Sequence, residues 1–439
     1  MTALFAMLCV GKVVLMSRCY DRPSGHSIIM KSKDAQGNIF MTAQFRFADQ
    51  LDVAGKTVLV RLDVNVPLSD GVVSDDTRIR RVMPGVRALL DHGAKVVILT
   101  HFGRPRGEFV PALTVRPVAQ AMSKILGQQV AVESDVIGPG GKAAVSALGP
   151  GELLLMENLR FYPEEETNDK DFAERLAGLG DFYIGDAFSC AHRAHASVDA
   201  LPRIMTSAAG RSFAAELEAL NAVLSQPARP VGAVVGGAKV SSKLALLENL
   251  VTKVDGLVLG GGMANTFLLA QGKSIGASLA EADMVETANR IMDAAASNDC
   301  KLLLPKDVFV AVEFKLGAAH RVVEIGDVAN GEMILDAGPE AIAVASRFLK
   351  ECATIVWNGP MGAFEIPPFD TATNALARIV AAETQNNGQI SVAGGGDTMA
   401  ALANAGVNDQ FTYVSTAGGA FLEWLEGKRL PGVEALRTS

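Results

Sequence analysis

Side chains that bind anions recur directly after apolar, strand-like runs in the first half of the chain. A lone arginine is usually solvated or paired at a protein surface. Several guanidinium groups at one edge of a sheet would repel one another unless an anion lay between them, and their planar donors match phosphate and carboxylate oxygens. The pattern predicts a site for a small, multiply anionic metabolite. In chain order the residues are Asp63, Asn65, Arg78, His101, Arg104, Asn158, Arg160, His192, Arg193 and His195.

Glycine-rich segments follow the apolar runs of the second half. They cover residues 236–239, 260–262, 394–398 and 415–419. Glycine lets backbone N–H groups approach phosphate oxygens, and a helix that starts there adds a favourable dipole. Tight turns between a strand and a helix also use glycine for steric reasons alone, so one such loop would decide nothing. Four of them in one half of the chain predict a cradle for nucleotide phosphates.

Three charged residues accompany these glycines. Lys239 and Lys243 are four residues apart at the start of a predicted helix, so both are expected on one face within reach of phosphate. An ordinary solvated helix face would show the same spacing. Asp397 can hold Mg²⁺, which prefers carboxylate and nucleotide oxygens, and it can equally cap the helix that follows.

Two other kinds of site are disfavoured. Cys190, His192 and His195 could ligate a metal, but a structural zinc site needs four ligands and no fourth has suitable spacing. The segment GGGMAN has Asn265 where the dinucleotide-binding fingerprint requires its third glycine, which disfavours a nicotinamide-dependent dehydrogenase. Such an enzyme would bind NAD and not ATP.

The elements that must position these residues alternate between β-branched runs and helical patterns from Lys56 onward. The runs are almost uniformly apolar, as in parallel strands covered on both faces, and ligands bind outside the carboxyl ends of such strands. The predicted fold is α/β, with two doubly wound, Rossmann-like parallel-sheet domains at residues 41–210 and 227–415. A connecting helix over 211–226 joins them, and a cleft separates them. Residues 1–40 lack the pattern and are expected to be an extension that is disordered or not native.

Composition limits the class of protein. The chain has 439 residues, of which 49% are hydrophobic, and a formal net charge of −8, so a globular two-domain protein is expected and a nucleic-acid partner is not. Five cysteines, an odd number without any Cys-x-x-Cys pair, indicate a reducing compartment and predict a cytoplasmic protein. No uninterrupted apolar stretch is long enough to span a membrane.

The ordered motifs of the chain resemble those of the phosphoglycerate kinase family from about Phe45 to Leu436. They include RLDVNVP, DDTRI, THFGRP, MENLRF, AHRAHAS, GGAKVSSK, GGGMANTF, VWNGPMGAFE, AGGGDT and STAGGAFLEWLEGK. The resemblance implies a glycolytic, hinge-bending, monomeric kinase with a carboxyl group as acceptor. It would transfer a phosphoryl group reversibly from 1,3-bisphosphoglycerate to MgADP, giving 3-phosphoglycerate and MgATP. The alternative is a non-catalytic two-domain nucleotide-binding protein that kept the fold.

The resemblance also assigns roles to individual residues. It implies that Arg78, which would face the transferred phosphoryl group, is catalytic together with Lys239 and Lys243. Residues 416–439 would return to the first domain. Ala417 departs from a run that is usually all glycine, which affects how closely that loop approaches the phosphate. The implied 3-phosphoglycerate site is Asp63, Asn65, Arg78, His101, Arg104, Arg160 and Arg193. The implied nucleotide site is Lys243, Glu365 at the ribose, Gly394, Gly395, Gly396, Asp397 at the Mg²⁺ ion, and Thr398.

Overall fold

The first large sheet has six parallel strands. The structure is a computed structural model that describes residues 31–33, 39–41 and 45–438. The strand order is β10-β9-β3-β6-β8-β7. Successive side chains of β3 point to opposite faces of the sheet, so Val58 and Val60 pack into the core on one face and Leu59 packs into the core on the other. The bounds are β3 Thr57–Leu62, β6 Lys95–Leu99, β7 Ala131–Glu133, β8 Leu153–Met156, β9 Phe182–Asp186 and β10 Thr206–Ala209.

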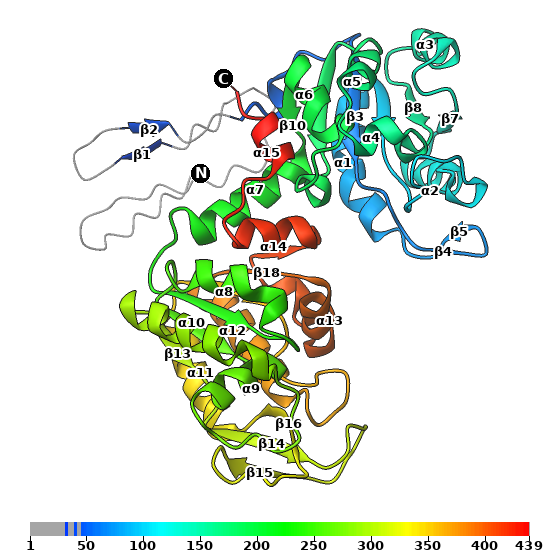
Figure 1. Ribbon diagram of the computed structural model, residues 1–439. Helices are drawn as coiled ribbons and strands as arrows, with labels where there is room; N and C mark the ends of the chain where they lie inside the picture. Colours follow the sequence, from blue (N-terminus) through cyan, green and yellow to red (C-terminus); the bar gives the residue numbers. More distant parts are fainter. Residues whose placement is uncertain (1–30, 34–38, 42–44, 439) are drawn as a thin grey trace.

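Helices cover both faces of this sheet (Figure 1). Buried residues of α1 (Thr77–Asp91) and α2 (Arg116–Leu126) share a core with Val58 and Val60. Buried residues of α5 (Lys170–Ala177) share the opposite core with Leu59. Shorter elements of this half are β4 Leu68–Ser69, β5 Val72–Val73, α3 Pro139–Ser146, α4 Pro163–Glu166 and α6 Leu201–Ile204.

The second large sheet repeats the plan. Its six parallel strands have the order β13-β12-β11-β17-β18-β19. Helices α8, α9 and α10 cover one face, and α11, α12 and α13 cover the other. The strands are β11 Val231–Val235, β12 Gly256–Leu259, β13 Lys301–Leu303, β17 Thr354–Asn358, β18 Ile390–Gly394 and β19 Tyr413–Ser415. The helices are α8 Leu244–Leu250, α9 Gly261–Ala270, α10 Val285–Ser297, α11 Pro339–Glu351, α12 Thr371–Asn387 and α13 Gly396–Ala405. The α/β prediction with two doubly wound parallel sheets is confirmed.

A third, antiparallel sheet departs from the prediction. The segment 301–312 reads as one strand-like run, but it is divided between β13 and β14 (Asp307–Ala311). Pro305 lies at the division and has no N–H to continue a hydrogen-bonded ladder. Strand β14 instead pairs with β15 (His320–Glu324) and β16 (Met333–Ala337).

The connecting segments bring the two halves together. Helix α7 (Arg211–Leu224) links the sheets, and its buried residues share one core with residues of both. After α14 (Gly419–Leu425), the chain passes through α15 (Pro431–Ala435), which lies beside the first half in Figure 1. The backbone N–H of Gly432 donates to the carbonyl of Ala191 at 2.8 Å. The division into domains at particular residues stays a prediction.

The N-terminal segment is only partly covered. Strand β1 (Lys31–Lys33) pairs antiparallel with β2 (Ile39–Met41), so two short strands precede the point where regular patterning was expected to begin. The rest of the predicted extension, 1–30 and 34–38, lies outside the described residues. Within the part of the chain that the structure describes, no helix is both long and apolar enough to cross a membrane.

Candidate active site

The predicted anion-binding residues gather at one edge of the first sheet. Strands β3, β6, β8 and β9 are parallel, so the loops that follow them lie at the same edge. Hydrogen bonds join these loops to one another. The side-chain oxygen of Asn65 accepts from the N–H of Gly103 at 3.0 Å, and that of Asn158 accepts from the N–H of Phe102 at 3.0 Å. The post-strand loops therefore form one connected rim.

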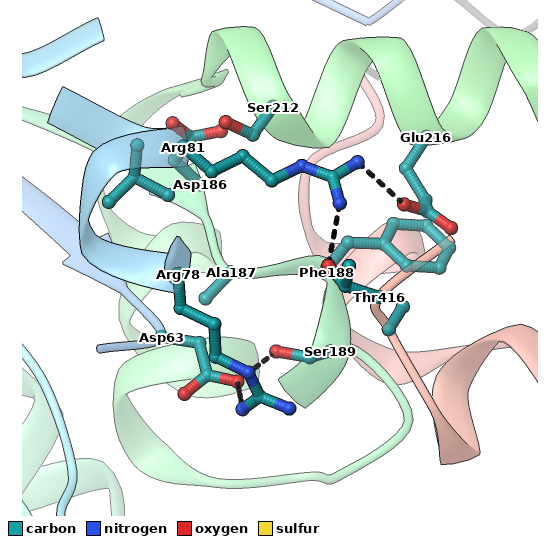
Figure 2. Close-up of a pocket in the computed structure, with 12 residues that line it drawn as sticks. Asp63, Arg78, Arg81, Asp186, Ala187, Phe188, Ser189, Ser212, Glu216 and Thr416 are labelled. Carbon is teal, nitrogen blue, oxygen red and sulfur yellow. Dashed lines mark hydrogen bonds and ion pairs between the residues drawn. The ribbon is translucent and has the colours of Figure 1, made fainter. Parts of the chain in front are cut away.

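Arg78 is held loosely at this rim. It lies in the first turn of α1, and one nitrogen, Nη1, contacts both Asp63 Oδ2 at 3.2 Å and the carbonyl of Asn65 at 3.3 Å. The hydroxyl of Ser189 also donates to Asp63. Figure 2 shows Asp63, Arg78 and Ser189 together. Because 45% of the Arg78 side chain is exposed, its guanidinium keeps donors that an incoming anion can use.

Arg160 is buried at the same rim. Its Nη1 donates to the carbonyl of Gly103 at 2.8 Å, and its Nε lies 3.2 Å from Glu166 Oε1. Burial, and then the nearby charge of Arg193, lower the pKa of Arg160. Burial lowers a cation's pKa because it removes the water that solvates the charge, and a like charge adds repulsion. An anion bound between the two arginines would relieve that repulsion.

A buried arginine that the sequence analysis did not single out lies behind the rim. Arg61, in β3, is 1% exposed and donates to Ser197 Oγ at 2.8 Å and to His101 Nδ1 at 3.1 Å. It also donates to the carbonyl of Leu62. None of these acceptors carries a full negative charge. Arg61 therefore adds positive charge behind the anion-binding rim.

The histidines of the site are neutral. Burial, and then the charge of Arg61, lower the pKa of His101 well below its usual range. Burial, and then the charge of Arg160, lower the pKa of His195 to about 3. Both histidines are uncharged at neutral pH, so the positive charge of the rim comes from the arginines.

The two remaining predicted arginines differ in their contacts. The Nε of Arg193 donates to His192 Nε2 at 3.2 Å, and the side chain is partly buried. Arg104 is exposed and makes no hydrogen bond or ion pair to any residue that the structure describes. The structure thus places Arg193 within the connected rim, and Arg104 at its solvent-facing side.

On the second sheet, the expectation that Lys239 and Lys243 share one helix face is wrong. Lys239 precedes the 3₁₀ turn Ser241–Lys243, and α8 begins only at Leu244, so the two lysines do not share a helix face. Lys239 is exposed. Lys243 donates from Nζ to the carbonyls of Gly236 at 2.6 Å and Asn358 at 3.1 Å, and burial lowers its pKa to about 8.

The glycines of this half divide into two kinds. A Cβ atom on Gly236 would lie 1.7 Å from the carbonyl oxygen of Pro360, so this glycine is required by close packing of two loops. Gly395 has φ +104°, a conformation that favours glycine, and a Cβ on Gly396 would meet nothing within 4 Å. The start of α13 is therefore open to a ligand. Asn358, not predicted, donates from Nδ2 to the carbonyl of Gly394 at 2.7 Å and joins this loop to the Lys243 loop.

The predicted residues of the start of α13 have distinct environments. Gly395 is the N-cap of the helix, so the alternative that Asp397 caps it is wrong. The Asp397 carboxylate is exposed and makes no hydrogen bond or ion pair with the described residues. Thr398 is buried, and its hydroxyl accepts from the N–H of Gly359 at 2.7 Å. Thr398 thus orders the neighbouring loop, whereas Asp397 has free oxygens.

Glu365 lies in the exposed part of the loop between β17 and α12. The buried side chain of Asp336, in β16, anchors the far end of this loop, because its Oδ2 accepts from the N–H of Ala372 at 2.8 Å. Within the loop, the N–H of Ala363 donates to the carbonyl of Leu335 in β16 at 2.8 Å. The loop that carries Glu365 is therefore tied to the end of β16 and the start of α12.

The two halves of the site meet across a cleft that Asp63, Arg78, Glu216 and Thr416 line (Figure 2). A Cβ atom placed on Gly419, the first residue of α14, would lie 3.4 Å from His192 Nε2, so the start of α14 abuts the anion-binding loops. The geometry offers an anion site and a phosphate cradle joined by a cleft.

Comparison with known proteins identifies the family. The sequence profile described as phosphoglycerate kinase matches residues 48–428, which include both sides of the cleft. The chain belongs to the phosphoglycerate kinase family. The phosphoglycerate kinase of Rhodospirillum centenum is 57% identical over 392 residues, covering 89% of this chain and 99% of that protein. The phosphoglycerate kinase of Ruegeria sp. is 56% identical over 390 residues, covering 89% of this chain and 98% of that protein.

Solved structures agree with the sequence relatives. The structure of phosphoglycerate kinase from Coxiella burnetii matches with a TM-score of 0.85 and 43% identity, covering 90% of this chain and 99% of that one. The crystal structure of the Pyrococcus horikoshii phosphoglycerate kinase matches with a TM-score of 0.73 and 30% identity, covering 90% and 98%. The chain is thus a glycolytic kinase that transfers a phosphoryl group reversibly between 1,3-bisphosphoglycerate and ADP. The non-catalytic alternative is not favoured.

Proposed function

We propose that the connected rim of the first sheet binds 3-phosphoglycerate and 1,3-bisphosphoglycerate. Support comes from the charge balance of the rim, where three arginines lie near two neutral histidines. Arg78 acts on the phosphoryl group during transfer, because it keeps free donors at the cleft. The other binding residues are Asp63, Asn65, His101, Arg104, Arg160 and Arg193.

The nucleotide is proposed to bind at the second sheet. Lys243 and Lys239 neutralise phosphate charge, the open start of α13 at 394–398 supplies backbone N–H groups, and Glu365 contacts the ribose. Buried Lys243 is the observation that carries this proposal, since a desolvated cation gains most from a phosphate partner.

Asp397 fits a magnesium ion. Mg²⁺ is usually held by one or two carboxylates together with substrate phosphates, while it keeps several waters. The free oxygens of Asp397 fit that chemistry, and the described residues contain no cluster of three or more metal-binding side chains that would form a closed protein cage. When bound, the ion would neutralise phosphate charge. Asp397 is proposed to orient the metal-nucleotide complex at the start of α13.

The transfer itself needs no general base. In the ATP-consuming direction, a carboxylate oxygen of 3-phosphoglycerate attacks the γ-phosphorus, and the bond from that phosphorus to the β-phosphate oxygen breaks. A carboxylate is already ionised at neutral pH, so no proton has to be removed. Catalysis then consists of positioning and charge neutralisation by Arg78 and the lysines. Closure of the cleft would exclude water that could hydrolyse the acyl phosphate.

A coupled assay tests the proposed function. Purified protein with 1,3-bisphosphoglycerate and MgADP is expected to form ATP and to show no affinity for NAD. Arg160→Ala should raise KM for 3-phosphoglycerate more than it lowers kcat, whereas Lys243→Met should raise KM for the nucleotide. Nucleotide binding without ATP formation would instead support a non-catalytic protein.

We also propose that the enzyme is a cytoplasmic monomer. The three cysteines within the described residues, Cys190, Cys300 and Cys352, are free, and burial raises the pKa of each thiol. Free buried thiols suit a reducing compartment. Light scattering after size exclusion should give a single species near the chain mass, and a species of twice that mass would contradict the monomer.

A further inference from the structure

Arg81 connects the two sides of the cleft. It lies on α1, three residues and about one helical turn beyond Arg78. Its Nη1 donates to Thr416 Oγ1 at 2.7 Å, and its Nη2 donates to the hydroxyl of Tyr413. The guanidinium carbon also lies 5.3 Å from the centre of the Tyr413 ring. Tyr413 belongs to β19 and Thr416 to the loop before α14, so one side chain of the first half holds two residues of the second.

A buried carboxylate completes this contact. Glu216, from the connecting helix α7, is buried, and its Oε2 accepts from the Tyr413 hydroxyl at 2.6 Å. The same oxygen is 3.9 Å from Arg81 Nη2. Burial raises the pKa of Glu216, while hydrogen bonds from Ser415 and Tyr413 and the charge of Arg81 act in the opposite direction. Arg81 is therefore the countercharge of a carboxylate on the helix that links the two halves.

The arrangement ties the phosphate loop to the helix that carries Arg78. Figure 2 shows Arg78 directed toward Asp63, while Arg81 reaches toward Glu216 and Thr416. Arg78 and Arg81 lie one turn apart on the same helix, so a movement of the 415–418 loop relative to α1 that the Arg81 side chain cannot follow breaks its contacts with Thr416 and Tyr413. We propose that Arg81 is a positioning residue for phosphoryl transfer, which keeps the 415–418 loop aligned with Arg78. This inference rests on the role proposed above for Arg78.

The kinetic consequence follows from where alignment is needed. Each substrate binds largely to one half of the molecule, so binding does not require the loop and Arg78 to be aligned. Transfer does require it, and small displacements of reacting groups lower rates strongly. Loss of Arg81 should therefore lower kcat and leave KM nearly unchanged.

Four variants test the proposal by steady-state ATP formation. Arg81→Met keeps the aliphatic length and removes the charge, and we expect kcat to fall about tenfold or more with KM for both substrates within about twofold. Arg81→Lys keeps a cation and should recover part of kcat. Tyr413→Phe should lower kcat less, and the Arg81→Met/Tyr413→Phe double variant should be no slower than Arg81→Met, because both changes act on one contact.

Arg80→Met is the matched control. Arg80 is adjacent on α1, but it is 63% exposed and pairs with Asp76, the residue that precedes the same helix. Its loss should leave kcat unchanged. Thermal unfolding of all variants separates an effect on positioning from an effect on stability. The ring centres of Trp424, in α14, and Phe188, in the first half, are 6.3 Å apart, so Trp424 fluorescence reports the contact between α14 and the first half.

The outcomes are distinct. An Arg81→Met variant whose kcat is within twofold of the wild type would overturn the proposal, even if its melting temperature fell. An Arg81→Met variant with a higher KM at unchanged kcat, or with a higher kcat, would also overturn it. If Arg81→Met fails to fold, a folded Tyr413→Phe variant with unchanged kcat would overturn it. A wild-type enzyme that forms no ATP would refute the proposed function instead.

Discussion

Lys243 should take up a proton when the nucleotide binds. Burial lowers its pKa to about 8 from the ordinary 10.5. The difference corresponds to about 3 kcal/mol of lost solvation for the charged amine, which a bound phosphate can offset. If the phosphates restore the ordinary pKa, ADP binding takes up about 0.1 proton at pH 7, about 0.5 at pH 8 and about 0.9 at pH 9. The phosphates themselves titrate near pH 6 and contribute little above pH 8.

Calorimetry measures this uptake directly. The binding enthalpy of MgADP is determined at pH 8 and pH 9 in buffers of different ionisation enthalpy, and the slope gives the number of protons. Lys243→Arg is the matched control, because a guanidinium stays protonated and its variant should show a slope near zero. A wild-type slope near zero at pH 9, or the same slope in the Arg variant, would refute the reasoning.

Three further predictions concern the metal, the histidine and the extension. Asp397→Asn should weaken MgADP binding by at least about tenfold without changing 3-phosphoglycerate affinity, measured by titration, because only the nucleotide carries the metal; equal losses would make Asp397 structural. His195 has a pKa of about 3 in the fold and 6.5 when unfolded, so the stability it gives is complete above pH 6.5 and is lost as the pH falls towards 3. The wild type should therefore lose its advantage in free energy of unfolding over His195→Gln as the pH falls from 6.5 to 4, as measured by urea titrations. A difference that stays constant over this range would contradict the prediction. Removing residues 1–40 should leave kcat and the melting temperature nearly unchanged, and a large loss of either would show that the extension is part of the fold.

Much of the site could be predicted because parallel strands place their following loops at one edge. Asp63, His101 and Arg160 follow three separate strands, and the apolar runs before them mark where each strand ends. The glycine loops were predictable for the same reason. The steric requirement for glycine at position 236 could not be predicted. A Cβ atom there would clash with Pro360, which is more than 120 residues away in the sequence.

Other features depend on contacts that local patterns do not encode. Arg61 sits inside the apolar strand TVLVRL, where only its charge distinguishes it, and its partners His101 and Ser197 are distant in the sequence. The expectation that Lys239 and Lys243 share a helix face was wrong because a 3₁₀ turn, and not an α-helix, follows Lys239. Arg81 meets Thr416 only because α7 and α14 bring the two halves together.

The most direct test of the account is the steady-state kinetics of Arg78→Ala. Arg78, loosely held by Asp63 at the cleft, is proposed to act on the phosphoryl group during transfer more than on either resting substrate. ATP formation from 1,3-bisphosphoglycerate and MgADP is measured for the wild type and the variant, over a full range of both substrates. We predict that kcat falls by roughly three orders of magnitude, the scale of losing an arginine finger, with modest change in either KM. A variant with near-normal kcat, or one whose only defect is a higher KM, would contradict the account.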